Sequence, residues 1–78
     1  MEHMLKLGDK GQQVKMMQQW LNNHGFKAGE EDGIFGEKTR DAVIEFQGRK
    51  KIVTDGMIGS QTQITMERVN KQEATRNI

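Results

Sequence analysis

Two aspartates that stand directly before glycines, Asp32 and Asp55, are the residues of this sequence best suited to do chemistry. A carboxylate in such a turn can accept hydrogen bonds from hydroxyl or amide groups. To act as a general acid and base, the two would have to lie about 5 to 9 Å apart, with one raised pKa. Nothing in the sequence arranges this, and Asp before Gly commonly bonds its own downstream amides as an Asx turn. We therefore predict turn residues first, ligand contacts second, and no catalytic pair.

Other catalytic or metal-binding groups are few. The chain has no Cys, and its two His residues, His3 and His24, stand far apart in the sequence. A zinc site needs three or four clustered nitrogen, sulfur or carboxylate ligands, and a calcium loop needs alternating oxygen ligands. A Ser-His-Asp set in a suitable context is missing too. We predict no metal, no cofactor and no enzymatic activity for this chain.

The turn that begins at Asp32 offers further candidate ligand contacts. Gly33 and Ile34 follow the carboxylate, and Phe35 is expected in the core with its edge toward the groove. Arg40, early in the next predicted helix, could pair with a carboxylate through two hydrogen bonds, although a plain exposed Arg is the commoner outcome. The groove from Asp32 to Phe35, with the start of that helix, is the predicted contact surface.

Trp20, the only Trp, lies beside the apolar face of the first predicted helix and pairs with Met16 at i+4. We expect a contact at the edge of the core. The alternative is a platform for a sugar ring, because amphipathic aromatics suit half-wet surfaces. Gln18 is expected to face inward, where an amide without a partner is unfavourable. We predict that Gln18 bonds loop backbone and that Gln47 braces a turn.

Three Gly-x-x-Gly turns must position these residues. They span 8–11, 33–36 and 56–59, so that successive copies lie 25 and 23 residues apart. Gly reaches positive φ without steric cost, and the second Gly of each turn stands where a helix N-cap falls. Each turn opens into a segment of helical periodicity. The chain is therefore three turn–helix units in succession.

The apolar positions of the units repeat at helical spacing. Four residues of the second unit fall at i, i+3, i+4 and i+7, and the other two units repeat this face. The three faces are Val14, Met17, Gln18 and Leu21; Thr39, Ala42, Val43 and Phe46; and Thr62, Thr65, Met66 and Val69. This predicts helices at about 12–22, 37–49 and 60–70, the first ending at a left-handed Gly25.

Helices this short are not stable alone, so the three faces are expected to share one core. Residues outside the helices complete that core: Leu5, Leu7, Phe26, Phe35, Ile52 and Ile58. We predict an all-α fold, a compact three-helix bundle with structured loops. Residues 1–4 are an N-terminal extension or cloning remnant, 5–70 are the folded domain, and 71–78, where the apolar stripe is lost, are a tail or linker.

The charges of the chain are nearly balanced, with 12 Lys and Arg against 11 Asp and Glu. A nucleic-acid-binding domain usually carries a basic stripe, whereas the densest basic run here is Arg49 to Lys51. No apolar run is long enough to span a membrane, and no signal sequence is recognisable. We predict neither a nucleic-acid nor a membrane partner, and we expect a monomer.

These motifs resemble the peptidoglycan-binding domain that accompanies the catalytic domains of many bacterial and phage wall hydrolases. That family follows Leu-x-x-Gly-x-x-Gly-x-x-Val-x-x-Leu-Gln-x-x-Leu, then Gly-Phe/Tyr, Asp-Gly-x-Phe-Gly-x-x-Thr-x-x-Ala-Val-x-x-Phe-Gln and Asp-Gly-x-x-Gly-x-x-Thr. The matching residues are Leu5, Gly8, Gly11, Val14, Met17, Gln18, Leu21, Gly25, Phe26, Asp32, Gly33, Ile34, Phe35, Gly36, Thr39, Ala42, Val43, Phe46, Gln47, Asp55, Gly56, Gly59 and Thr62. The match runs in register from position 5 to 69.

Three positions depart from that family pattern. Lys51 stands where the family usually has Gly, Gln63 where many members have Trp, and Met17 replaces Leu. The exchange of Leu for Met conserves volume. The other two changes bear on the packing of the third unit and on any contact made from that edge.

The resemblance implies a non-catalytic module that binds peptidoglycan through the glycan strand or the stem peptide. Such a module anchors an attached amidase, muramidase, transglycosylase or peptidase, and so raises its local concentration on the polymer. The expected location is the cell wall, the periplasm or the extracellular space. The lack of a signal sequence favours an excised module or a phage-encoded lysin acting on a host wall. The alternative function is a protein-interaction module that docks a partner or catalytic domain, using Met16 and Trp20.

Overall fold

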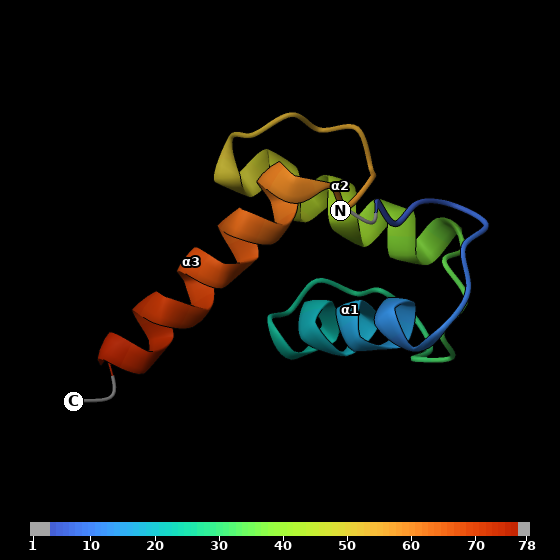
Figure 1. Cartoon of the computed structure of the whole chain (residues 1–78), viewed down its shortest axis with the longest axis horizontal. Helices are drawn as coiled ribbons and strands as arrows, with labels where there is room; N and C mark the ends of the chain where they lie inside the picture. Colours follow the sequence, from blue (N-terminus) through green and yellow to red (C-terminus); the bar gives the residue numbers. More distant parts are fainter. Residues whose placement is uncertain (1–3, 77–78) are drawn as a thin grey trace.

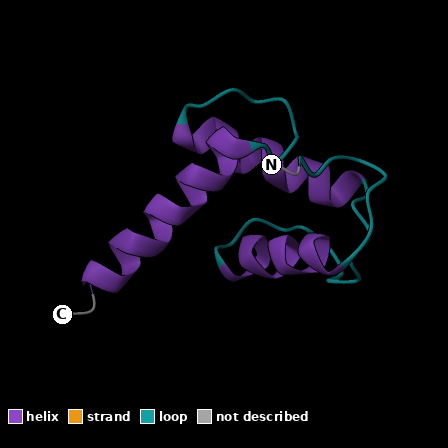
Figure 2. Cartoon of the chain, in the orientation of Figure 1, coloured by secondary structure: helices purple, strands orange, loops and turns teal. Residues whose placement is uncertain are grey.

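The computed structural model describes residues 4–76 of the chain. It contains three helices, α1 (Gln12–Asn23), α2 (Glu37–Lys50) and α3 (Ser60–Arg76). Loops join them, and the part of the chain that the structure describes contains no strand, only two isolated β-bridges (Figure 2). The predicted all-α fold of three turn–helix units is confirmed.

Each helix begins directly after the second glycine of its turn. Gly11 and Gly36 are the N-caps of α1 and α2, and neither helix has a side-chain cap. The first backbone hydrogen bonds repeat in all three units: Lys15 N–H to Gly11 O (3.2 Å), Arg40 N–H to Gly36 O (3.0 Å) and Gln63 N–H to Gly59 O (3.0 Å). The internal repeat of the sequence is therefore a repeat of helix starts.

Both α1 and α2 end in the same left-handed motif. After α1, Gly25 has φ 86°, and the N–H of Phe26 donates to Leu21 O at 2.8 Å, as in a Schellman motif. After α2, Lys51 takes the glycine position with φ 58°, and Ile52 N–H donates to Gln47 O at 3.1 Å. Lys51 is the one non-glycine residue with positive φ among residues 4–76. The left-handed Gly25 is confirmed, and Lys51 is strained because it has a Cβ.

The third helix is longer than predicted. Sequence periodicity predicted that this helix ends near residue 70, whereas α3 continues to Arg76. Its last turns are held by polar contacts with α1, from Asn70 to Trp20 and from Glu73 to His24. The apolar stripe stops at Val69, so a criterion based on apolar spacing could not detect these turns.

The helices α1 and α2 run in the same direction, and the loop 24–36 returns along α1 between them (Figure 1). Both begin at one end of the molecule, where Lys10 forms a bridge with Ile34. Toward the other end the rings of Phe26 and Phe46 meet edge to face, with centroids 5.5 Å apart. A second bridge, between Leu5 and Ile58, ties the N-terminal segment to the third turn.

One core fills the space between these elements. Its buried apolar residues come from all three helices and from the loops: Leu5, Val14, Leu21, Phe26, Ala28, Phe35, Ala42, Val43, Phe46, Ile58 and Met66. The prediction that Leu7 lies in the core is wrong, because its side chain is 48% exposed. The backbone turns between Lys6 and Asp9, where the N–H of Asp9 donates to the carbonyl oxygen of Lys6 at 3.0 Å. Because of this turn, the side chain of Leu7 does not follow that of Leu5 into the core. Ile52 is only half-buried.

Candidate functional site

The side chain of Gln18 fastens the second turn to α1. Its Nε2 donates to Ile34 O (2.9 Å), Thr39 Oγ1 (3.0 Å) and Asp32 Oδ1 (3.3 Å). Its Oε1 accepts from the backbone N–H of Gly33 at 2.9 Å. The side chain is 1% exposed, so these bonds satisfy an otherwise isolated buried amide. The prediction that Gln18 bonds loop backbone is confirmed.

Gln47 on α2 makes the same set of contacts with the third turn. Its Nε2 donates to Met57 O (2.9 Å), Thr62 Oγ1 (3.0 Å) and Asp55 Oδ1 (3.1 Å), and its Oε1 accepts from Gly56 N–H at 2.9 Å. We call the two sets the Gln18 clasp and the Gln47 clasp. Each helix thereby fixes the turn that begins the following unit, and the prediction for Gln47 is confirmed.

The two predicted aspartates belong to these clasps. Oδ1 of Asp32 accepts from Ile34 N–H at 2.9 Å, and Oδ1 of Asp55 accepts from Met57 N–H at 3.0 Å, so both form Asx turns. The bonds from the Ile34 amide and from Gln18 hold the pKa of Asp32 below its ordinary value of 3.8. Both side chains are exposed at the surface. Asp32 is therefore a fixed negative charge at neutral pH.

Beside Asp32 lies an open hollow of about 430 Å³. The loop before α2 and the first turn of α2 form its walls, with lining residues Gln18, Ala28, Gly29, Glu30, Asp32, Ile34, Gly36, Glu37, Lys38 and Thr39. We call this space the second-turn hollow. Its rim carries charges of both signs and one apolar group: the carboxylates of Glu30, Asp32 and Glu37, the ammonium group of Lys38 and the half-exposed side chain of Ile34. Such a rim can bind a polar ligand that carries both signs of charge.

Asn22 ties the wall of the hollow to α1. Its Oδ1 accepts from Ala28 N–H at 2.7 Å, and its Nδ2 donates to Gly29 O at 2.9 Å. A β-carbon at Gly29 would lie 3.2 Å from Cδ of Lys38, so the Lys38 stem packs closely on this glycine. Sequence reasoning missed Gly29 and Lys38. The one available signal was a glycine among loop charges, where close backbone approach is common.

Arg40 does not join the second-turn hollow. Its stem lies across the third turn, where a β-carbon at Gly56 would be 2.9 Å from Cγ of Arg40. Its Nη2 lies 3.6 Å from Oδ1 of Asp41, and its Nε is buried without a hydrogen-bond partner. The expectation that Arg40 lies beside the Asp32 turn is thus wrong for its side chain. It lies near the turn of Asp55, which also does not line the hollow.

Trp20 occupies a third place, between α1 and α3. The ring of His24 stacks on it at 3.9 Å and 23°, and the ring of Phe46 meets its edge at 5.3 Å. Its Nε1 donates to Oδ1 of Asn70 at 2.9 Å. The indole is therefore a contact at the edge of the core, as the first interpretation had it, and one of its faces is covered.

Of the remaining predicted contacts, Gly33 and Phe35 are the buried residues of the second turn. The ring of Phe35 is 1% exposed, so it supports the turn from within and presents no edge to a ligand. A β-carbon at Gly33 would lie 3.0 Å from the carbonyl oxygen of Gly11, which explains the need for glycine at this crossing. Asp32 and Ile34 are the predicted contacts that reach the hollow.

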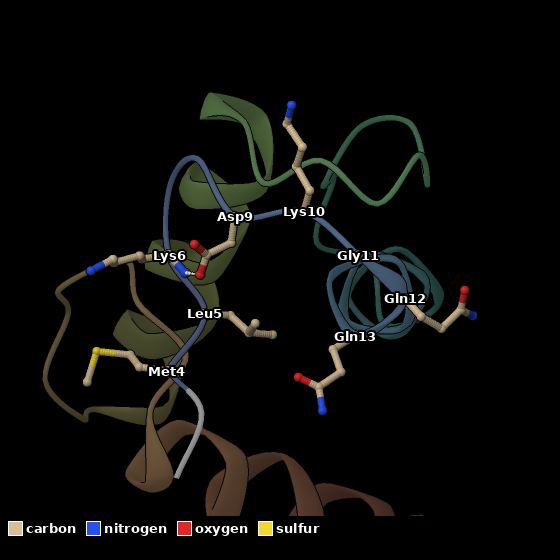
Figure 3. A pocket seen from close by; sticks show the side chains of 8 residues that line it. All are labelled: Met4, Leu5, Lys6, Asp9, Lys10, Gly11, Gln12 and Gln13. Carbon is tan, nitrogen blue, oxygen red and sulfur yellow. Dashed lines mark hydrogen bonds between the residues drawn. The ribbon is translucent and has the colours of Figure 1, made fainter.

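Two further hollows lie away from the second turn. One of about 480 Å³ lies between the N-terminal segment and the start of α1, where Lys6 N–H donates to Oδ2 of Asp9 at 3.0 Å (Figure 3). The side chains of Lys6 and Lys10 point in different directions there (Figure 3), so we interpret this hollow as a seam between two segments. Another, of about 540 Å³, lies on the outer face of α3 and is lined by Ile64, Glu67, Arg68, Asn70, Lys71 and Ala74.

Among residues 4–76, His, Asp and Glu side chains form no group of three or more that could hold a metal ion. In that same range, no helix has the length and apolar character required to cross a bilayer.

Comparison with known proteins gives consistent matches. A family model described as "Putative peptidoglycan binding domain" matches residues 10–66. The spore cortex-lytic enzyme of Bacillus cereus is 30% identical over 69 residues, which are 88% of this chain and 27% of that enzyme. The crystal structure of the SleB N-terminal domain superposes with a TM-score of 0.82 and 30% identity, covering 86% of this chain and 92% of that one. A Burkholderia AP3 phage endolysin gives a TM-score of 0.77 and 39% identity, with coverages of 82% and 24%.

Proposed function

Because the chain belongs to the peptidoglycan-binding domain family, we propose that it is a non-catalytic module that holds a wall hydrolase on peptidoglycan. The chain spans 27% of the length of the spore cortex-lytic enzymes it matches, and 24% of the phage endolysin. A module of this size within a longer enzyme supplies affinity rather than chemistry, because tethering raises the effective concentration of the attached domain. The partner of this chain would be a hydrolase domain, and its place of action the wall.

The second-turn hollow is the contact surface that we propose. The observation that carries this assignment is the Gln18 clasp, in which a buried amide fixes Asp32, the backbone of the second turn and Thr39 with four hydrogen bonds. A preorganised rim loses little entropy when it binds. Asp32 and Ile34 are the ligand contacts on this surface, and Gly33 and Phe35 set its shape from beneath. Arg40 and Asp55 would extend the surface along the third turn, and Trp20 would not contribute.

The charges of the rim favour the stem peptide over the glycan strand. Asp32 and Glu37 can pair with amines, and Lys38 can pair with a carboxylate, so a short peptide with both groups is a matched ligand. A glycan strand offers mainly hydroxyl and acetamido groups, which would leave these charges without partners of opposite sign. Exposed charges of this kind give modest affinity. A weak single site is sufficient for a module that is joined to an enzyme acting on the same polymer.

The experiment is cosedimentation of the chain with purified sacculi of several wall types, with chitin and cellulose as control polymers. Two variants change the rim without removing stems: Asp32→Asn keeps an acceptor for the Ile34 amide, and Lys38→Met keeps the stem that packs on Gly29. Two matched controls change the same charges elsewhere, Glu67→Gln on α3 and Lys50→Met at the end of α2. Circular dichroism establishes that all four stay helical.

We expect the chain to be retained on sacculi but not on chitin or cellulose. Retention on sacculi should be reduced in both rim variants and unchanged in both control variants. Soluble stem peptide should compete for binding, and peptide-free glycan should not. If sacculi of every type fail to retain the chain, the proposed function is wrong. If Glu67→Gln abolishes retention and the rim variants do not, the outer face of α3 is the contact surface. Binding of the catalytic domain alone, without sacculi, would support the protein-docking alternative.

The module is also proposed to act as a monomer. Its exposed large apolar side chains include Met16 on α1, Ile34 at the second turn and Ile64 on α3. They lie on different elements, and scattered single apolar side chains are normal on a monomer's surface. Sedimentation at micromolar concentration tests this, and a stable dimer would overturn it.

A further inference from the structure

Two peptide bonds of this chain, Asp32–Gly33 and Asp55–Gly56, have the sequence at which aspartate most readily isomerises to isoaspartate. In that reaction the backbone nitrogen of the following residue attacks the aspartate side chain, and glycine hinders the attack least because it has no Cβ. The other two aspartates, Asp9 and Asp41, precede Lys and Ala. The two Asp-Gly turns are thus the places where the main chain is most open to this reaction.

Isomerisation proceeds through a cyclic succinimide and needs no reactant other than water. The glycine nitrogen forms a bond to Cγ of the aspartate, while the bond from Cγ to the carboxyl hydroxyl breaks. The amide proton and this hydroxyl leave together as water. Another water molecule then opens the ring at either carbonyl, which returns aspartate or gives isoaspartate. The reaction therefore requires a free glycine N–H, a carboxyl group that can turn toward it, and a proton on that carboxyl group.

The Gln18 clasp opposes each of these requirements at Asp32. Gly33 is buried and its N–H donates to Oε1 of Gln18 at 2.9 Å, so the attacking nitrogen is occupied. Oδ1 of Asp32 accepts from Ile34 N–H at 2.9 Å and from Nε2 of Gln18 at 3.3 Å, and these bonds hold the carboxyl group in its Asx turn. The same two bonds keep the pKa of Asp32 below its ordinary value of 3.8, which reduces the protonated fraction.

The Gln47 clasp repeats the first two constraints at Asp55. Gly56 is buried and its N–H donates to Oε1 of Gln47 at 2.9 Å. Oδ1 of Asp55 accepts from Met57 N–H at 3.0 Å and from Nε2 of Gln47 at 3.1 Å. In both turns the aspartate is exposed to water, so the group that the fold shields is the glycine nitrogen. Each turn is shielded by one glutamine, and the two glutamines lie on different helices.

We propose that the Gln18 and Gln47 clasps protect the two Asp-Gly bonds from isomerisation, each clasp acting on its own turn. This chemical role adds to the structural one, because a turn can be held in place while its glycine N–H stays free. At Asp32 the consequence rests on the proposed function. Isoaspartate would insert the aspartate methylene into the main chain and move a carboxylate on the rim of the second-turn hollow, which would damage the contact surface.

The test is incubation of the chain in mildly acidic buffer at room temperature for several weeks, with samples taken at intervals. Trypsin releases residues 28–38 and 52–68, in which Asp32 and Asp55 are the only aspartates. Chromatography separates the isoaspartate forms of these peptides, and electron-transfer fragmentation identifies them. The readout is the ratio of the isomerisation rate at Asp32 to the rate at Asp55. A wild-type sample unfolded in urea gives the rates of the two unprotected bonds.

The variants are Gln18→Met and Gln47→Met, each of which removes one clasp and leaves the other. Met66→Ala is the destabilised control, because it removes buried volume from the core and leaves both clasps in place. Circular dichroism establishes that the variants are helical, and if one glutamine variant is not, the other decides the question. Since nothing is bound to sacculi in this assay, a failure of the proposed function would not affect its result.

Both bonds of the folded wild type should isomerise more slowly than in urea. Gln18→Met should raise the ratio of the two rates at least about fivefold, the factor that corresponds to losing a hydrogen bond to a buried group, and Gln47→Met should lower it similarly. In Met66→Ala the two rates should rise together, because only global unfolding becomes more frequent. A ratio that does not change in either glutamine variant would overturn the proposal. Wild-type rates as fast as those in urea would overturn it too.

Discussion

Replacing Gln18 with Met tests whether the Gln18 clasp holds the second turn. Methionine keeps the buried stem and volume but removes all four hydrogen bonds of the amide. Thr39 keeps its bond to Ala28 O at 3.2 Å, and Asp32 keeps the Ile34 amide at 2.9 Å. The groups left without partners are the N–H of Gly33, which is buried, and the carbonyl of Ile34.

The magnitude follows from these two groups. A buried backbone group without a partner costs about 1–3 kcal/mol, so Gln18→Met should lower the free energy of unfolding by about 3 kcal/mol. The total free energy of unfolding of a chain of this length is about 4–12 kcal/mol, at about 0.05–0.15 kcal/mol per residue. The melting temperature should fall by more than about 12 °C, since about 1 kcal/mol corresponds to about 4–8 °C in a small domain.

Urea unfolding followed by circular dichroism measures the change, with two comparison variants. Gln47→Met removes the equivalent four bonds of the third turn and should lower stability by a similar amount. Gln19→Met changes the neighbouring exposed glutamine of α1 and should stay within about 0.5 kcal/mol of the wild type. A Gln18→Met variant that is no more destabilised than Gln19→Met would show that the Gln18 clasp does not hold the second turn.

Three further predictions use the same unfolding assay. Lys51→Gly should raise stability by about 1 kcal/mol, because it relieves the left-handed strain at φ 58°; no gain would mean that Lys51 is not strained. Gly33→Ala should lower stability by more than about 1 kcal/mol, given φ 79° and a carbonyl oxygen 3.0 Å from the new β-carbon. Its control, Gly48→Ala in open space on α2, should raise stability by about 0.5–1 kcal/mol. Equal losses of stability in the two variants would contradict the close approach of Gly33 to the carbonyl oxygen of Gly11. Because the pKa of Asp32 is lowered on folding, its stabilising effect is complete above the ordinary value of 3.8 and is lost as the pH falls through the lower folded value. Asp32→Asn should therefore flatten the acid side of a stability-against-pH curve, and an unchanged acid side would exclude this role.

The helices, their starting glycines and the roles of both glutamines were predictable because each depends on local spacing. Periodicity identified the buried faces of α1 and α2, including Thr39 and Phe46. An inward-facing glutamine has few ways to satisfy its amide, so the requirement to pair buried polar groups predicted that Gln18 bonds loop backbone, although not which turn residues it bonds.

The errors concern contacts between segments far apart in the sequence. The path of Arg40 across Gly56 depends on where the third turn crosses α2, and no spacing within α2 encodes that crossing. The extension of α3 depends on polar pairs with α1, not on an apolar stripe. The second-turn hollow likewise needs Lys38 and Gly29 to meet, and that contact was visible only in three dimensions.

The two clasps also set an order in which the chain can fold during synthesis. Gln18 is already made when the turn it fastens emerges from the ribosome, and the same holds for Gln47 and the third turn. The position 23 residues after Gln47 is Asn70, whose Oδ1 accepts from Trp20 on α1. Each unit can therefore be locked as it is translated, with the contact to α1 formed last. Vectorial folding of this kind limits the time that a growing chain exposes an unfinished turn.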